Sequence, residues 1–152
     1  RILNNVFVGN GYNINSAQFP DMPSYAVCLK LNSSFIRGND IQDCGYWHHY
    51  SSQYDEGEEL YNNNVGCLYI QGNNNIIAEN HCSVLSTSAA HSIEVVGNYN
   101  IIADTNIVNS SIKINGSNNV LGYIIGVTAI YVKADSGNII DSQYDSSIIH
   151  YI

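Results

Sequence analysis

The chain has 152 residues, of which 45% are hydrophobic and only 12% are charged, and its formal net charge is −8. This length suits a single domain with one continuous core. Five Lys and Arg against thirteen Asp and Glu exclude a nucleic-acid-binding protein, because phosphate contacts require clustered basic side chains. No apolar run approaches the ~20 residues that span a bilayer, so no membrane insertion is expected.

Four cysteines, Cys28, Cys44, Cys67 and Cys82, follow neither a CxxC spacing nor a Cys/His zinc spacing. Two disulfides are one alternative, but unpaired cysteine is among the residue types most often buried. We therefore expect buried thiols. No charged and apolar leader of the signal-peptide type opens the chain, and we expect no cofactor.

An internal repeat runs through the chain, marked by a polar residue, usually asparagine, followed by two apolar residues. The units are Ser34-Phe35-Ile36, Asn75-Ile76-Ile77, Asn100-Ile101-Ile102, Asn119-Val120-Leu121 and Asn138-Ile139-Ile140. The second apolar residue, here called the anchor, recurs at Ile2, Ile36, Ile77, Ile102, Leu121 and Ile140, with spacings of 34, 41, 25, 19 and 19 residues. The shortest spacing represents a bare coil, and the longer ones contain insertions. We predict that the anchors from Ile36 to Ile140 are all buried.

Other positions keep the same register and predict three short strands in each coil. Nine and seven residues before the anchor lie the pairs Val27 and Leu29, Leu68 and Ile70, Ile93 and Val95, and Ile112 and Ile114, with Ile130 and Val132 shifted by one residue. Such alternation indicates a strand with one face in the core. Five residues after the anchor lie Phe7, Ile41, Cys82, Ile107 and Gly126, which indicate a third strand that fades toward the end.

Two turn positions also repeat. Three residues after the anchor lie Asn5, Asn39, Asn80 and Thr105, and we expect the asparagines to stack and to bond the main chain. The preceding turn contains Gly72, Gly97 and Gly116, where a positive φ would favour glycine.

Together these columns predict an all-β, single-stranded parallel β-helix, or solenoid, of about six coils. The pattern resembles the pectate-lyase-like superfamily, with its right-handed parallel β-helix and asparagine ladders, over essentially all 152 residues. The right-handed sense is implied by this resemblance alone. That superfamily includes pectinolytic enzymes, epimerases, adhesins and phage tailspikes, so the resemblance specifies fold better than function. Both ends break off within a coil, so we expect a fragment of a longer chain or coverage by neighbouring subunits.

Two insertions, residues 12–25 and 46–65, leave the regular coil. The second reads YWHHYSSQYDEGEELYNNNV and contains the only tryptophan. Trp and Tyr rings stack on sugar rings and carboxylates bind hydroxyls, and loops on rigid scaffolds are usual binding sites. The candidate glycan-binding residues are Trp47, His48, Tyr50, Tyr54, Asp55, Glu58 and Tyr61. The alternatives are a contact with another subunit and a solvated loop.

The candidate catalytic residues are the carboxylates Glu79, Asp104, Asp40 and Asp43. Glu79 and Asp104 both lie two residues after an anchor, so the strand spacing of about 4.8 Å would bring them near the separation found in retaining glycosidases. One carboxyl of such a pair would have a raised pKa. Asp40 and Asp43 are candidates for a wider, inverting pair with an acid of the second insertion. The alternative in each case is an acid that simply faces water.

Any enzyme of this kind is predicted to be a glycoside hydrolase. A polysaccharide lyase needs a basic residue, for which only Arg37 is placed, and usually calcium. The sequence predicts no metal site, because the adjacent His48 and His49 rarely ligate one ion and His81 stands apart from them. Eight residues before the anchor, Tyr69, Glu94 and Lys113 form an outward column, with Tyr131 close to it. We expect Glu94 and Lys113 to pair, and the tyrosines to line a groove or a subunit interface.

Three functions follow from these features. The first is a segment of an extracellular, viral host-attachment spike that binds, and in one version hydrolyses, a cell-surface polysaccharide as a homotrimer on the virion surface. The second is a secreted, monomeric polysaccharide hydrolase or lyase. The third is a structural solenoid of an adhesin or filament with no active site.

Overall fold

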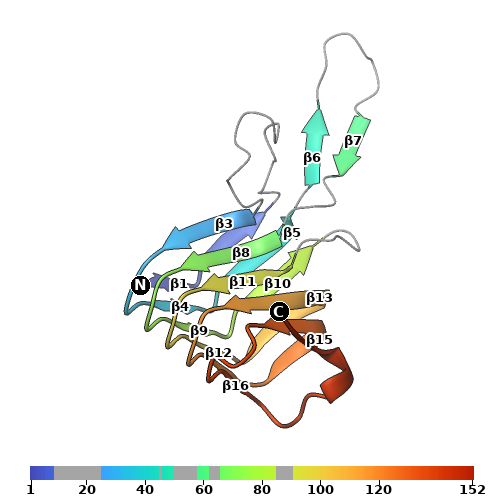
Figure 1. Cartoon of the computed structure of the whole chain (residues 1–152). Helices are drawn as coiled ribbons and strands as arrows, with labels where there is room; N and C mark the ends of the chain where they lie inside the picture. The colour runs from blue at the N-terminus through green and yellow to red at the C-terminus, as the bar shows by residue number, and fades with distance from the viewer. Residues whose placement is uncertain (9–24, 45, 50–57, 62–65, 85–90) are drawn as a thin grey trace, which may run out of the picture.

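The computed structural model describes residues 1–8, 25–44, 46–49, 58–61, 66–84 and 91–152 (Figure 1). For residues 7, 8, 43, 44, 84 and 109, and for the short strands at 46–49 and 58–61, it describes the backbone alone. The described chain is all-β, and its main sheets consist of parallel strands stacked repeat upon repeat, an arrangement consistent with a β-helix or solenoid. The structured part includes no helix long and apolar enough to cross a membrane.

One sheet has six parallel strands and contains the anchors. Its strands, in order, are β1 (Ile2–Leu3), β4 (Phe35–Arg37), β9 (Ile76–Ala78), β12 (Ile101–Ala103), β14 (Val120–Leu121) and β16 (Ile139–Ile140). The anchors pair in the predicted register along the whole sheet: Ile2, Ile36, Ile77, Ile102, Leu121 and Ile140. The repeat deduced from the sequence is therefore confirmed.

The second sheet has nine strands. Seven lie in the order β2 (Val6–Val8), β5 (Asp40–Cys44), β10 (His81–Val84), β13 (Thr105–Asn115), β11 (Ile93–Val96), β8 (Gly66–Gln71) and β3 (Tyr25–Lys30), while β15 (Ile124–Val132) pairs with β13 and with β17 (Ile149–Tyr151). The 11-residue β13 pairs with β10 through its first part and with β11 through its second. One strand, β13, therefore spans the positions that are occupied by two separate strands, such as β10 and β11, in the earlier repeats. A 3₁₀ turn, Ser146–Ile148, precedes β17.

A third sheet is the antiparallel hairpin of β6 (Tyr46–His49) and β7 (Glu58–Tyr61), which stands off the stacked strands in Figure 1. The second insertion thus begins as a hairpin. Of the first predicted insertion, residues 12–25, only Tyr25 lies within the described residues, as the first residue of β3.

The core is a single cluster of stacked aliphatic side chains. Ile36, Ile77, Ile102 and Leu121 are at most 1% exposed, as predicted. Ile140 is only half-buried, which corrects the prediction for this residue, because β16 is the edge strand of its sheet. Cys67 and Cys82 are buried as expected, whereas Cys28 is exposed on the outer face of β3.

The predicted asparagine ladder is present. The side-chain oxygen of Asn80 accepts from the backbone amide of Asn39 at 3.1 Å and from its side-chain amide at 2.9 Å. The Asn80 side-chain amide donates to the Ile36 carbonyl at 3.0 Å. Asn39 bonds Asn5 in the same way, with its oxygen 3.0 Å from the Asn5 amide. The ladder stops at Thr105, whose hydroxyl donates to the Ala103 carbonyl of its own turn at 3.0 Å.

A second buried ladder runs through the asparagines that mark the repeat, and the sequence had suggested only their alignment. Asn75, Asn100 and Asn119 are 0% exposed. The backbone amide of each asparagine donates to the side-chain oxygen of the equivalent asparagine in the next repeat. The distance is 2.9 Å from Asn75 to Asn100, and 2.8 Å from Asn100 to Asn119 and from Asn119 to Asn138. Buried polar side chains are tolerated here because every one is bonded to main chain.

Substitution of Asn80 by alanine should lower the free energy of unfolding by about 1–3 kcal/mol, because it removes the side-chain acceptor of the buried Asn39 amide and the side-chain donor to the Ile36 carbonyl. Urea unfolding followed by circular dichroism measures the loss. Asn106→Ala, at an exposed position in the next repeat, is the control and should change stability by less than about 0.5 kcal/mol. Equal losses in the two variants would contradict a structural role for the ladder.

A positive φ was expected at Gly72, Gly97 and Gly116, but it does not explain all three glycines. Gly72 and Gly97 have φ of 145° and 144°, whereas Gly116 lies outside the positive-φ set. What the three share is close stacking. A Cβ atom on Gly116 would lie 1.8 Å from the carbonyl oxygen of Gly97, and one on Gly97 would lie 2.0 Å from that of Gly72. Glycine is required here because the backbones of successive repeats nearly touch.

Candidate functional site

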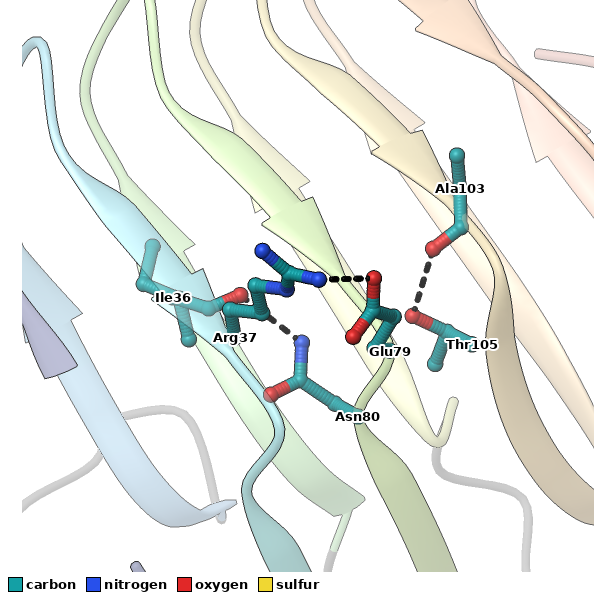
Figure 2. A network of polar contacts seen from close by, with 6 residues as sticks. All are labelled: Ile36, Arg37, Glu79, Asn80, Ala103 and Thr105. Atoms are coloured by element: carbon teal, nitrogen blue, oxygen red, sulfur yellow. Dashed lines mark hydrogen bonds and ion pairs between the residues drawn. The ribbon is translucent and has the colours of Figure 1, made fainter. Parts of the chain in front are cut away.

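The predicted carboxylate pair lies at a tight turn between the two main sheets. Glu79 and Asp104 are both exposed, have φ of 54° and 48°, and immediately precede the ladder position. Glu79 directs its carboxylate toward Arg37 on the preceding repeat, with the two side chains 2.6 Å apart (Figure 2). The structure therefore gives Glu79 a basic partner. Both acids occupy equivalent positions of adjacent repeats, as the sequence indicated.

The other two predicted acids belong to β5, and the Asp40 side chain lies on its outer side. Asp40 bonds Nδ1 of His81, its neighbour on β10, at 2.8 Å, and its second oxygen bonds the Gln42 side chain. Asp40 and His81 are about one-third exposed, with side-chain exposures of 35% and 39%. The Asp43 side chain lies outside the described residues. Within the described part of the chain, no three His, Cys, Asp or Glu residues are grouped as metal ligands would be.

The proposed glycan loop is described only in part. Trp47 and His48 lie on β6, and Glu58 and Tyr61 lie on β7, where Trp47 pairs with Leu60. Their side chains, and all of Tyr50, Tyr54 and Asp55, lie outside the described residues. The role of this loop therefore stays a prediction.

Another polar site lies on the outer face of the nine-stranded sheet. We call it the outer-face cluster: Tyr25, Tyr69, His91, Glu94, Ser111, Lys113, Tyr131 and His150. It contains the outward column predicted from the sequence, in which Tyr69, Glu94, Lys113 and Tyr131 lie in register on successive strands, and His150 on β17 continues this column. Strand pairing thus brings together residues that are far apart in the sequence.

Glu94 is the centre of the cluster. Its side chain is only 14% exposed, and one oxygen lies 3.1 Å from the Lys113 ammonium. The other oxygen accepts from the hydroxyl of Tyr25 at 2.8 Å. This confirms the expected pairing of Glu94 with Lys113 and adds Tyr25 as a partner. Burial, together with the charge and hydrogen bond of Glu94, raises the pKa of the Tyr25 phenol far above its ordinary value, so this hydroxyl stays a donor.

Aromatic rings surround this charged pair. The ring of Tyr25 contacts that of Tyr69 with a centroid distance of 5.5 Å. Tyr131 lies 4.9 Å from the ring of His91 and stacks on His150 at 5.0 Å. Offset and tilted pairs at these distances are favourable. The result is a face on which aromatic surface alternates with fixed donors and acceptors.

His91 has one further partner, the hydroxyl of Ser111, 2.7 Å from its Nδ1 atom. Burial lowers the pKa of His91, the Lys113 ammonium lowers it further, and Glu94 acts in the opposite direction. The imidazole is therefore neutral at pH 7. Its Nδ1 atom can accept the serine proton.

Sequence reasoning missed Tyr25, His91, Ser111 and His150. Tyr25, Gly66 and His91 are the first described residues after the segments 9–24, 62–65 and 85–90. The ring of Tyr25 crosses above Gly66, where a Cβ atom would lie 2.2 Å from that ring. The cluster thus lies beside the points at which inserted segments return to the sheet. The amino-acid composition of any one insertion therefore could not reveal the outer-face cluster.

No family model, curated protein or solved structure matches the chain. The function must therefore be inferred from the residues themselves.

Proposed function

We propose that the chain is a glycan-recognising β-solenoid that binds a cell-surface polysaccharide on the outer-face cluster. The observation that supports this most strongly is the arrangement around Glu94, with aromatic rings on both sides of a bonded carboxylate and ammonium. Sugar rings present apolar faces and outward hydroxyls. Aromatic surface matches the first, and Lys113 and the tyrosine hydroxyls match the second.

The proposal also covers the handedness of the solenoid, the number of its coils, its superfamily and its location. The chain is a right-handed parallel β-helix of about six coils that resembles the pectate-lyase-like superfamily, and it belongs to an extracellular or virion-surface host-attachment spike. The low charged fraction, 12%, and the abundance of neutral polar residues support a surface that meets uncharged sugars. Cleavage of the glycan by Glu79 with Asp104, or by Asp40 or Asp43 with an acid of the second insertion, is a separate proposal that depends on polysaccharide turnover being observed.

Tyr131→Ala should weaken glycan binding about two- to tenfold, because it removes about 0.5–1.5 kcal/mol of aromatic contact. Surface polysaccharides would be screened on an array, and the affinity for the best ligand measured by calorimetry. Tyr123→Ala, which removes an exposed tyrosine outside the cluster, is the matched control. Trp47→Ala tests whether the hairpin extends the same site. Unchanged affinity in the Tyr131 variant would overturn the proposal that the glycan binds on the outer-face cluster.

The homotrimer expected for a host-attachment spike has one specific observation in its favour. The residues just before the anchors form an outward column that is apolar from β4 to β16: Phe35, Ile76, Ile101, Val120 and Ile139. Phe35, Ile101 and Ile139 are 44%, 41% and 63% exposed. A contiguous apolar stripe of this kind is typical of a subunit interface. We propose this stripe as the contact of the expected homotrimer, and a monomeric mass by light scattering at high concentration would exclude it.

A further inference from the structure

Ser111 and His91 have the geometry of a nucleophile and its base. The Ser111 hydroxyl lies 2.7 Å from Nδ1 of the imidazole. Both side chains are half-buried. The ring of Tyr131, 4.9 Å from that of His91, packs against the imidazole and limits its rotation. A serine within hydrogen-bond reach of an oriented, neutral histidine is the arrangement that activates a hydroxyl for attack on a carbonyl.

A fixed positive charge stands beside this pair. Lys113 lies two residues after Ser111 on β13, so both side chains project from the same face of the strand. Its ammonium is held by Glu94 at 3.1 Å, and Glu94 is held in turn by Tyr25. A preorganised cation near the nucleophile is suited to stabilise the oxyanion that forms during acyl transfer.

We propose that Ser111, with His91 as its base, cleaves carboxylic esters, and that the natural substrate class is an O-acylated sugar. The choice of a sugar rests on the proposed glycan binding, whereas the reactivity of the pair does not. This places an esterase activity within the binding face. It is independent of the carboxylates considered for glycoside hydrolysis.

The chemistry balances with water as the only co-reactant. The Ser111 oxygen attacks the ester carbonyl while Nδ1 of His91 takes the hydroxyl proton. The tetrahedral intermediate, with its oxyanion toward Lys113, collapses to an acyl-serine. The sugar alkoxide leaves with the proton from His91. Water, deprotonated by the same nitrogen, then releases the carboxylic acid and restores the serine.

The first test uses a fluorophosphonate probe on the full chain. Attack by the Ser111 oxygen forms a serine–phosphorus bond and expels fluoride, and fragment-ion mass spectrometry places the adduct. We expect modification at Ser111 and loss of the adduct in Ser111→Ala and His91→Gln. Ser142→Ala is the matched control, since this serine is exposed and lies outside the cluster, and labelling should stay intact in it.

The second test measures nitrophenolate release from p-nitrophenyl acetate, which should fall about 100-fold in His91→Gln, the contribution typical of a general base. Unchanged thermal unfolding of this variant excludes a folding defect. An absence of adduct at Ser111 in the unmodified chain, or labelling that persists in His91→Gln, would overturn the proposal. Neither probe contains a sugar, so failed glycan binding and a failed nucleophile are distinguished.

Discussion

Replacement of Ile102 by aspartate should abolish soluble folding. Ile102 is an anchor with 0% exposure, stacked between Ile77 and Leu121 of the neighbouring repeats. A carboxylate there would have no partner among aliphatic side chains, and an unpaired buried charge costs several kcal/mol, comparable with the entire stability of a small domain. The soluble fraction after expression, and circular dichroism of whatever remains soluble, measure the effect.

Ile101→Asp is the matched control, because the adjacent residue on β12 faces outward and is 41% exposed. It introduces the same charge one residue away. We expect this variant to remain folded. A folded Ile102→Asp protein, or equal damage in both variants, would show that the anchor column is not the core.

Replacement of Gly97 by alanine is expected to have the next largest effect. The new methyl group would lie 2.0 Å from the carbonyl oxygen of Gly72, and φ at this position is 144°. Overpacking and backbone strain each cost about 1–3 kcal/mol, so we expect a loss of roughly 2–6 kcal/mol. Relief requires the two repeats to separate, which would weaken the bond from Gly72 to the Val96 carbonyl, now 2.9 Å.

Thermal unfolding of Gly97→Ala beside Asn98→Ala measures this cost. Asn98 is the next residue and is half-buried, and its side-chain oxygen accepts from the Ser117 amide at 2.8 Å. Asn98→Ala should therefore lower the free energy of unfolding less than Gly97→Ala does. A Gly97→Ala protein as stable as the unmodified chain would mean that stacking is looser than described.

The repeat was predictable because parallel pairing converts sequence spacing into spatial register. Once Ile77, Ile102 and Leu121 are aligned, every residue beside them must pair in step unless an insertion or bulge intervenes. The shift of Ile130 and Val132 by one residue was also visible in the sequence. It corresponds to the register shifts between β13 and β15, near the exposed Gly126.

The outer-face cluster was only half predictable. Tyr69, Glu94 and Lys113 follow from alternation, because they fall between inward residues. Tyr25 does not, since strict alternation would place it on the inner face. The amides of Cys67 and Leu68 both donate to the Ser92 carbonyl at 3.0 Å, so the ladder beside Tyr25 is locally irregular. Such an irregularity leaves no periodic signal in the sequence.

The left-handed corners have a consequence for how this surface can change. The residue before each ladder position has a positive φ, and these residues are chemically diverse: Asn4, Gly38, Glu79 and Asp104 at one corner, and Ser33, Asn74, Tyr99, Asn118 and Gly137 at the other. Because the buried ladder holds the backbone at each corner, the backbone conformation does not depend on which side chain the corner residue carries. At Gly38 and Gly137 an added Cβ atom would lie 2.3 and 2.7 Å from a neighbouring asparagine side chain. The other corner positions form rows at the regular strand spacing, along which mutation can change the surface without altering the scaffold.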